Sequence, residues 1–239
     1  PSDPALPVEA DEQTPWLGPL PDAALGDPAD AATRRESVGL AMAAALQHLP
    51  PRQRAVLILR DVLVFSAAET ADLLDMTVAS VNSALARARK TVAAVQARPG
   101  IGEGRPADAL DPHEQEVWDE FCAAFERYDV DGVVRVLAAD AIWEMPPFPG
   151  WYAGAERIGV LMRAQCPAQR AGDLRMLPTS CNGLPAAGMY LREPAPGGGD
   201  RWLPFQLDVL TIRDGAIAHI GAFFSPEAFR LAGLPDRLH

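Results

Sequence analysis

The chain has 239 residues, of which 49% are hydrophobic and 22% charged, so it can form one large core or two modest ones, and we expect two domains. Its net charge of -11 argues against indiscriminate nucleic-acid binding, and no apolar run approaches the length of a membrane span. There is no basic-then-apolar signal segment and the three cysteines lack metal-ligand spacing, so we expect a cytoplasmic protein with reduced, buried thiols and no membrane partner.

Charge is unevenly distributed along the chain. Residues 1–32 have a net charge of -7, residues 33–98 a net charge of +4, and residues 99–239 a net charge of -8. Only the middle block has the sign that approach to DNA requires.

The first thirty residues are rich in proline and acidic side chains, a composition typical of an extended linker. Trp16 and Leu17 are the conspicuous apolar residues within it. They can dock on a neighbouring domain, although an exposed aromatic residue in a linker is a comparably simple interpretation. Because the chain begins inside a linker, we expect that another segment once preceded it.

Residues 31–97 have the pattern of four short helices. Apolar residues at helical spacing predict one helix from about 31 to 49, which Pro50 and Pro51 end, and a second over 52–62. A third is expected over 66–74 and a fourth from residue 78. Each is too short to be stable alone, so we expect them to pack as one all-α bundle.

The third and fourth helices are predicted to form a helix-turn-helix. Ser66 and Glu69 have the spacing of a capping box, and residues 75–77 leave room only for a tight turn before Thr77 caps the next helix. Small Ala71 stands where two crossing helices need to approach closely. The alternative is an ordinary helical hairpin within a larger core.

The fourth helix has one apolar stripe and one small, polar and then cationic face. Such a face suits base edges at the helix tip and phosphates one to two turns later. The predicted stripe consists of Val78, Val81, Leu85, Ala88, Val92 and Val95. The predicted DNA-binding residues are Thr77, Ala79, Ser80, Asn82, Ser83, Arg87 and Lys90.

Three segments in this order, residues 49–57 (LPPRQRAVL), 65–74 (FSAAETADLL) and 81–89 (VNSALARAR), closely resemble region 4 of extracytoplasmic-function (ECF) sigma factors of bacterial RNA polymerase. The resemblance implies that the last helix binds the -35 promoter element. It also implies that the earlier helices contact the flap of the β subunit in the polymerase core.

Residues 16–22 (WLGPLPD) are similar to the linker between regions 2 and 4 in relatives with an extra C-terminal domain. Region 2 has no counterpart in the sequence, so we expect that the chain as given is not a complete sigma factor.

The predicted recognition helix departs from the family pattern. Asn82 and Ala84 stand where many relatives have Lys and Arg, and Asp75 occupies a turn position often given to Gly. Asp tolerates the left-handed conformation better than most residues, so the turn is retained. Fewer cations predict weaker binding with a flatter salt dependence, whereas the Asn82 amide suits bidentate pairing with adenine.

Residues 98–112 have the Gly, Pro and Asp content of a second linker, and residues 113–239 differ in pattern from the first domain. Helices near 117–125, 132–137 and 155–165 and strands near 141–145, 174–182, 186–193, 202–213 and 216–224 are expected. The Asp214–Gly215 pair predicts a two-residue hairpin turn. This order predicts an α+β domain whose curved antiparallel sheet wraps a helix-covered cavity.

Residues 143–154, 212–217 and 224–235 resemble the SnoaL-like branch of the nuclear-transport-factor-two-like superfamily. That fold hosts enzymes, ligand sensors and interaction modules. Region 4 followed by a SnoaL-like domain resembles a subgroup of sigma factors in which the C-terminal domain is thought to modulate activity. The resemblance therefore implies a transcription initiation factor with a regulatory domain.

The alternative is a small-molecule cyclase or isomerase fused to a DNA-binding module. If the Asp214–Gly215 turn pairs Arg213 with Ala216, Asp208 and His219 become diagonal neighbours on one sheet face. In a cavity such a pair could move protons, as in relatives with cyclase or isomerase activity, whereas on the outer face it is a solvated ion pair. We favour the structural interpretation, and so a domain that is not an enzyme, because the other face looks more suited to burial.

Aromatic residues of the second domain could line a ligand pocket or belong to its core. Binding there would make a small molecule a further partner. The sequence has no metal-ligand cluster, phosphate-cradling glycine loop or nucleophile motif, so we expect no metal ion and no cofactor. The candidate pocket residues are Trp143, Trp151, Tyr152, Tyr190 and Trp202.

Overall fold

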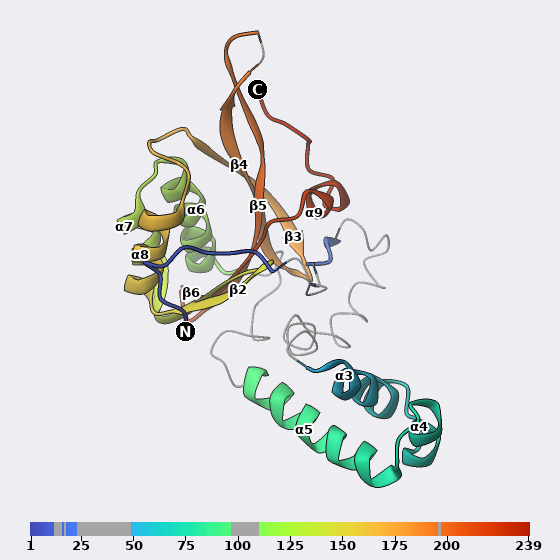
Figure 1. Cartoon of the computed structure of the whole chain (residues 1–239). Coiled ribbons are helices and arrows are strands. Elements are labelled where there is room, and N and C mark those ends of the chain that lie inside the picture. Colours follow the sequence, from blue (N-terminus) through green and yellow to red (C-terminus); the bar gives the residue numbers. More distant parts are fainter. Residues whose placement is uncertain (12–15, 17, 23–48, 97–109, 196) are drawn as a thin grey trace.

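The structure, a computed structural model, describes residues 1–11, 16, 18–22, 49–96, 110–195 and 197–239 (Figure 1). Most of the helix predicted over 31–49 and most of the second predicted linker lie outside these residues. No helix among the described residues is long and apolar enough to cross a membrane.

A bundle of short helices forms the first part. It contains α3 (Pro51–Leu57), which continues into the π-helical turn η2 (Ile58–Val62), then α4 (Ala67–Leu73) and α5 (Val78–Gln96). The predicted apolar stripe is confirmed at Val81, Leu85, Ala88 and Val92, all buried, but it is wrong at Val78, whose side chain is 45% exposed. Val78 is the first residue of α5, where the helix projects beyond the packed core.

The predicted helix-turn-helix geometry is confirmed. The Glu69 N–H donates to Ser66 Oγ (3.1 Å) and the Ser66 N–H donates to Glu69 Oε2 (2.7 Å), which is the reciprocal capping box. Asp75 takes the left-handed conformation (φ 51°), and the Met76 N–H donates to the Ala71 carbonyl (2.8 Å) across the turn. The Ser80 N–H then donates to Thr77 Oγ1 (3.1 Å), so Thr77 caps α5 as expected.

The second part is built on a six-stranded sheet with the strand order β2-β1-β6-β5-β4-β3. Neighbouring strands are antiparallel except for β1 and β6, which are parallel. The strands are β1 (Leu137–Met145), β2 (Phe148–Ala153), β3 (Leu174–Cys181), β4 (Leu184–Pro194), β5 (Asp200–Arg213) and β6 (Ala216–Phe223). The sequence patterns predicted five of them but missed β2, whose Pro149 and Gly150 are poor strand formers.

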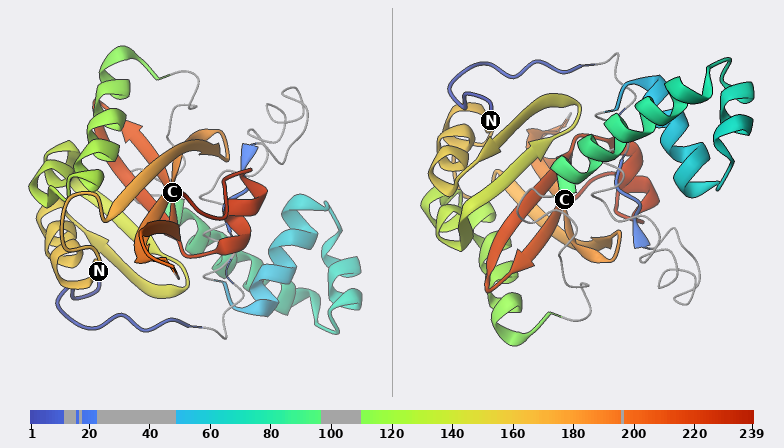
Figure 2. Two further views of the ribbon diagram at one scale, coloured as in Figure 1. Left: turned by 90° about the horizontal axis from the view of Figure 1, so that it is seen from above. Right: turned by 90° about the horizontal axis from the view of Figure 1, so that it is seen from below.

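Helices cover both faces of this sheet (Figures 1 and 2). On the concave face lie α6 (Pro112–Glu126), α7 (Val130–Val136) and α8 (Ala155–Gln165), and on the convex face lies α9 (Pro226–Leu231). The concave core contains Phe121 and Phe125 of α6 together with Trp143. This arrangement is the helix-covered curved sheet that the sequence predicted.

The convex face has a smaller core of its own. Tyr190 of β4 packs edge-on against Phe229 of α9, with ring centroids 5.3 Å apart. A Cβ on Gly188 would lie 2.6 Å from Leu234 Cδ1, so the absence of a side chain there lets the α9 segment approach the sheet.

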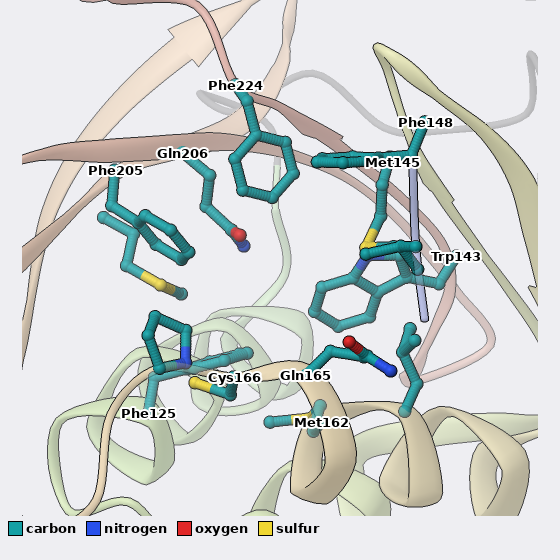
Figure 3. Close-up of a pocket in the computed structure, with 14 residues that line it drawn as sticks. Phe125, Trp143, Met145, Phe148, Met162, Gln165, Cys166, Phe205, Gln206 and Phe224 are labelled. Atoms are coloured by element: carbon teal, nitrogen blue, oxygen red, sulfur yellow. The ribbon is translucent and has the colours of Figure 1, made fainter. Parts of the chain in front are cut away.

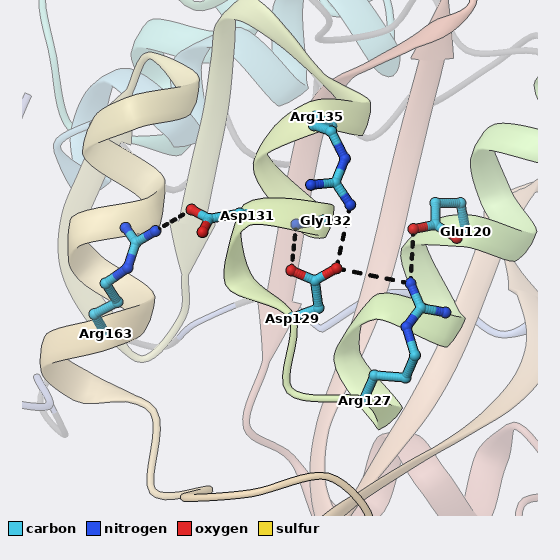
Figure 4. Close-up of polar contacts among 7 residues, drawn as sticks. All are labelled: Glu120, Arg127, Asp129, Asp131, Gly132, Arg135 and Arg163. Carbon is cyan, nitrogen blue, oxygen red and sulfur yellow. Dashed lines mark hydrogen bonds and ion pairs between the residues drawn. The ribbon is translucent and has the colours of Figure 1, made fainter.

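Charged residues join the concave-face helices to one another (Figure 4). Asp129 caps α7 by accepting from the Gly132 N–H (2.8 Å), and this hydrogen bond lowers the pKa of Asp129 below its usual value. Arg127 at the end of α6 approaches the same carboxylate (3.9 Å), while Arg163 of α8 pairs with Asp131 of α7. These contacts fix α7 between the two helices that wall the concave side.

A bulge in β6 changes the predicted register. Arg213 pairs with Ala216 as expected, but the register shifts by one residue after that, so Thr211 pairs with His219 and Asp208 with Ala222. The predicted diagonal pair of Asp208 and His219 is therefore wrong. A one-residue slip turns a side chain to the other sheet face, so Asp208 lies on the concave side and His219 on the convex side.

The N-terminal segment lies against the second domain. We call residues 2–11 the strap: the Ser2 N–H donates to the Trp151 carbonyl (2.7 Å) and the Asp11 N–H to the Pro147 carbonyl (2.9 Å). Further along, the Asn182 N–H donates to the Leu20 carbonyl (2.8 Å). Trp16 is half-buried, and its indole N–H donates to the Asp11 carbonyl (2.8 Å).

Candidate DNA-binding face and ligand cavity

The outer face of α5 is not covered by any residue that the structure describes. Pro50, Arg52 and Gln53 add to it, because a groove of about 570 Å³ runs between the start of α3 and α5. Arg52 and Gln53 were not among the predicted DNA-binding residues, and their signal in the sequence was their position directly after Pro50 and Pro51, where a helix begins. All seven predicted DNA-binding residues are exposed: Thr77, Ala79, Ser80, Asn82, Ser83, Arg87 and Lys90.

Two arginines of α5 have different environments. Arg87 lines the groove, whereas Arg89 makes a bidentate ion pair with Asp61 of η2 (3.0 and 2.7 Å). The hydrogen bond from Arg89 holds the pKa of Asp61 below its usual value. The Arg89 guanidinium is therefore used to join α5 to η2, and Arg87 faces the groove.

Replacing Ser66 by alanine should loosen the helix before the turn. An N-cap of this kind contributes about 1 kcal/mol, so amide hydrogens of α4 should exchange about fivefold faster in Ser66→Ala. Hydrogen exchange followed by mass spectrometry measures the rate. Ser83→Ala, at an exposed site on α5, is the control and should leave α4 unchanged. Unchanged exchange in Ser66→Ala would contradict the role of the cap.

The second domain contains a partly open cavity of about 280 Å³ between the concave face of the sheet and helices α6 and α8 (Figure 3). Its walls are almost entirely apolar. They consist of Val8, Phe125, Trp143, Met145, Phe148, Leu161, Met162, Gln165, Cys166, Pro167, Met189, Phe205, Gln206 and Phe224.

Of the five aromatic residues proposed for a pocket, Trp143 lines this cavity. Tyr152 is buried in the concave core, and Tyr190 packs on the convex face against α9. Trp202 stacks under the Arg175 guanidinium, 3.4 Å from its ring centroid. Trp151 lies on β2, where its carbonyl accepts the hydrogen bond from the strap.

Phe205 and Gln206 both reach the cavity because β5 has a bulge. Met189 pairs with Gln206 and Tyr190 with Pro204, which leaves Phe205 as an extra residue. The signal in the sequence was Pro204, since proline cannot donate to a sheet ladder and marks bulges.

Asp208 is fully buried beneath the cavity. Its Oδ1 accepts a hydrogen bond from Gln206 Nε2 (2.8 Å). Burial raises the pKa of Asp208 to about 7, and the hydrogen bond from Gln206 opposes that rise. His219, buried on the other face, has Nε2 3.5 Å from Glu144 Oε2. The two catalytic candidates therefore do not form one site.

Neither thiol near the cavity has the character of a nucleophile. Burial raises the pKa of Cys166, which lines the cavity, and raises that of Cys122 on α6 to about 12. A protonated thiol is a poor nucleophile. In the part of the chain that the structure describes, no group of three His, Cys, Asp or Glu side chains could hold a metal ion.

The geometry defines a class of protein in which a helix-turn-helix domain is joined to an α+β cone. The model of sigma-70 region 4 matches residues 39–92, and that of the SnoaL-like domain matches residues 118–220. Over 240 residues the chain is 46% identical to the ECF RNA polymerase sigma factor SigG of Mycobacterium tuberculosis, covering 99% of this chain. It is 27% identical over 222 residues to SigJ of the same species, covering 88% of this chain and 67% of SigJ.

The chain therefore combines a sigma-70 region 4 domain with a SnoaL-like domain and is similar to extracytoplasmic-function sigma factors. It spans 62% of the length of SigG. The crystal structure of M. tuberculosis SigJ has the same fold, with a TM-score of 0.51 and 22% identity over 94% of this chain and 78% of that chain.

Proposed function

We propose that the chain directs RNA polymerase to promoters by binding the -35 element through α5, while its SnoaL-like domain regulates that activity. The observation that supports this most strongly is the capped helix-turn-helix, which leaves Asn82 and Arg87 exposed on one helix face. The surrounding block of sequence, with its net charge of +4, has the sign that DNA attracts.

An exposed apolar patch on the same domain suits a protein partner. Leu63, Val64 and Phe65 are 54%, 82% and 37% exposed in the loop between η2 and α4. Apolar side chains gathered on a surface are typical of protein-binding sites. We assign this patch to the flap of the polymerase β subunit.

A regulatory role for the second domain is supported by its contacts with the N-terminal segment. The strap lies before region 4 in the chain and the SnoaL-like domain follows it, yet the two are hydrogen-bonded to each other. The domain thus holds chain segments on both sides of region 4. A catalytic role has less support, because Asp208 and His219 lie on opposite faces of the sheet.

Selection from a pool of random DNA duplexes tests the DNA-binding proposal. The chain should enrich a short consensus, and enrichment of no sequence would contradict it. Repeating the selection after removal of residues 113–239 tests regulation. An unchanged affinity and consensus would remove the regulatory proposal and leave the DNA-binding proposal intact.

Leu63→Glu should weaken binding to core RNA polymerase about fivefold, because a charge in an apolar contact costs at least about 1 kcal/mol. Leu231→Glu is the matched control, since Leu231 is 48% exposed on α9 of the other domain. Binding of the fluorescently labelled chain to the core enzyme measures both. Equal losses in the two variants would contradict the assignment of the patch.

A further inference from the structure

The strap forms part of the wall of the cavity. Val8 lines it, together with residues of α6, α8 and the sheet. The backbone is held on either side of Val8: Gln165 Nε2 donates to the Leu6 carbonyl (3.0 Å), and the Asp11 N–H donates to the Pro147 carbonyl (2.9 Å). The side chain that closes this part of the cavity thus belongs to a segment far from the domain in sequence.

The polar side chains that line the cavity include two uncharged glutamines, Gln165 and Gln206. No Lys, Arg, His, Asp or Glu is among the described residues that line the cavity. Both glutamine amides are oriented by hydrogen bonds that their nitrogens donate, Gln206 to buried Asp208 (2.8 Å) and Gln165 to the strap (3.0 Å). Their carbonyl oxygens accept no hydrogen bond from the described residues, and Figure 3 shows the Gln206 amide pointing into the cavity.

The remaining walls favour a flat, apolar molecule. Phe224 packs edge-on against Phe148 (5.2 Å between centroids) and against Phe205 (5.3 Å). With Trp143 on another side, these rings offer faces and edges to an aromatic system. A charged ligand would find no opposite charge in the wall and would lose its hydration.

We propose that the cavity binds a neutral, planar, largely apolar molecule that carries a hydrogen-bond donor such as a phenolic hydroxyl, and that the strap closes over it through Val8. The hydroxyl donates to the Gln206 carbonyl, and Asp208 is a positioning residue that turns the amide. This inference rests on the proposed regulatory role of the SnoaL-like domain and gives it a ligand.

Ligand binding and docking of the strap should be thermodynamically coupled, because Val8 of the strap is part of the cavity wall. If the strap contributes contacts to the ligand, the ligand must stabilise the docked strap by the same factor. Since the strap precedes region 4 in the chain, occupancy of the cavity sets how firmly the segment leading to region 4 is held.

A pair of probes tests the ligand chemistry on the whole chain. 2-Naphthol has a donor and 2-methoxynaphthalene has none, while their ring systems are the same. Calorimetric titration should give threefold to tenfold tighter binding of 2-naphthol, as one hydrogen bond contributes about 0.5–1.5 kcal/mol. Equal affinities would overturn the assigned donor, and binding of neither probe would overturn the site.

Two substitutions within the strap test its part in the site. Val8→Ser should weaken 2-naphthol about fivefold, whereas Leu6→Ser, at a side chain that is 60% exposed and outside the cavity wall, should leave binding unchanged. Saturating 2-naphthol should also slow hydrogen exchange at the Asp11 N–H of the unmodified chain. Unchanged binding in Val8→Ser together with unchanged exchange at Asp11 would show that the strap is not part of the site.

The titrations contain no DNA, so they separate this inference from the proposed function. Ligand binding with strap linkage, but without any effect of 2-naphthol on DNA selection, would retain the site and overturn its regulatory use. A regulatory effect of residues 113–239 without binding of either probe would retain the proposed regulatory function and overturn the ligand site.

Discussion

Arg87→Ala should weaken binding of the chain to every DNA duplex, whatever its sequence. Arg87 is exposed beside the groove of α5, where a guanidinium meets phosphates rather than bases. Losing one charge-assisted hydrogen bond of about 1.5 kcal/mol predicts a loss of about tenfold. The slope of log affinity against log salt should also fall by about 0.9. Fluorescence anisotropy at several salt concentrations measures both quantities.

Arg89→Ala is the matched control. It removes the same charge two residues away on the same helix, but the Arg89 guanidinium is already paired with Asp61. We expect the salt slope to stay unchanged in this variant. Equal slopes in the two variants would contradict the distinction between a cation that faces DNA and one that joins helices.

Asn82→Ala should act on sequence preference instead of overall affinity. Its exposed amide lies on the face that meets base edges, and a bidentate amide–adenine pair contributes about 1–3 kcal/mol of discrimination. The variant should lose about 1–3 kcal/mol of binding free energy on the selected consensus and almost none on random duplexes. Equal losses on both kinds of duplex for Asn82→Ala and Arg87→Ala would refute the division of roles.

Local chemistry made the helix-turn-helix predictable. The Ser66–Glu69 box, the left-handed Asp75 and the Thr77 cap each depend on residues within a few positions of one another. The Asp214–Gly215 turn was predictable for the same reason, and both residues have the positive φ (53° and 71°) that such a turn needs. Short-range rules were sufficient wherever the partners were close in sequence.

Most of the residues that form the cavity could not be predicted from the sequence, because they are brought together by features that leave no signal in nearby residues. The bulge in β6 has no marker such as glycine or proline, yet it places Asp208 and His219 on opposite faces. The contribution of Val8 required contact between residues more than a hundred positions apart, and no periodicity within a proline-rich segment indicates that. Trp202 was a reasonable pocket candidate by type, but the Arg175 guanidinium occupies its ring face.

The contribution of Asp208 to the free energy of unfolding of the SnoaL-like domain should fall as pH rises from about 4 to 7, and Asp208→Asn should remove that contribution. Burial raises the native pKa of Asp208 to about 7, whereas an unfolded aspartate titrates near about 3.9. Between these values the native state keeps a proton that the unfolded state has released, so stability decreases with pH by about 1.4 kcal/mol per unit. The full loss is roughly 4 kcal/mol above pH 7.

Asparagine at this position keeps the oxygen that accepts from Gln206 but never ionises, so above pH 7 the variant should be more stable than the unmodified chain by a few kcal/mol. Urea unfolding at a series of pH values measures the difference, and Asp140→Asn, at a carboxylate that is 58% exposed, is the control. Parallel stability curves for Asp208→Asn and the unmodified chain would show that the buried carboxyl has an ordinary pKa. In that case Asp208 would be almost fully ionised at neutral pH, whereas a pKa of about 7 leaves it about half protonated there.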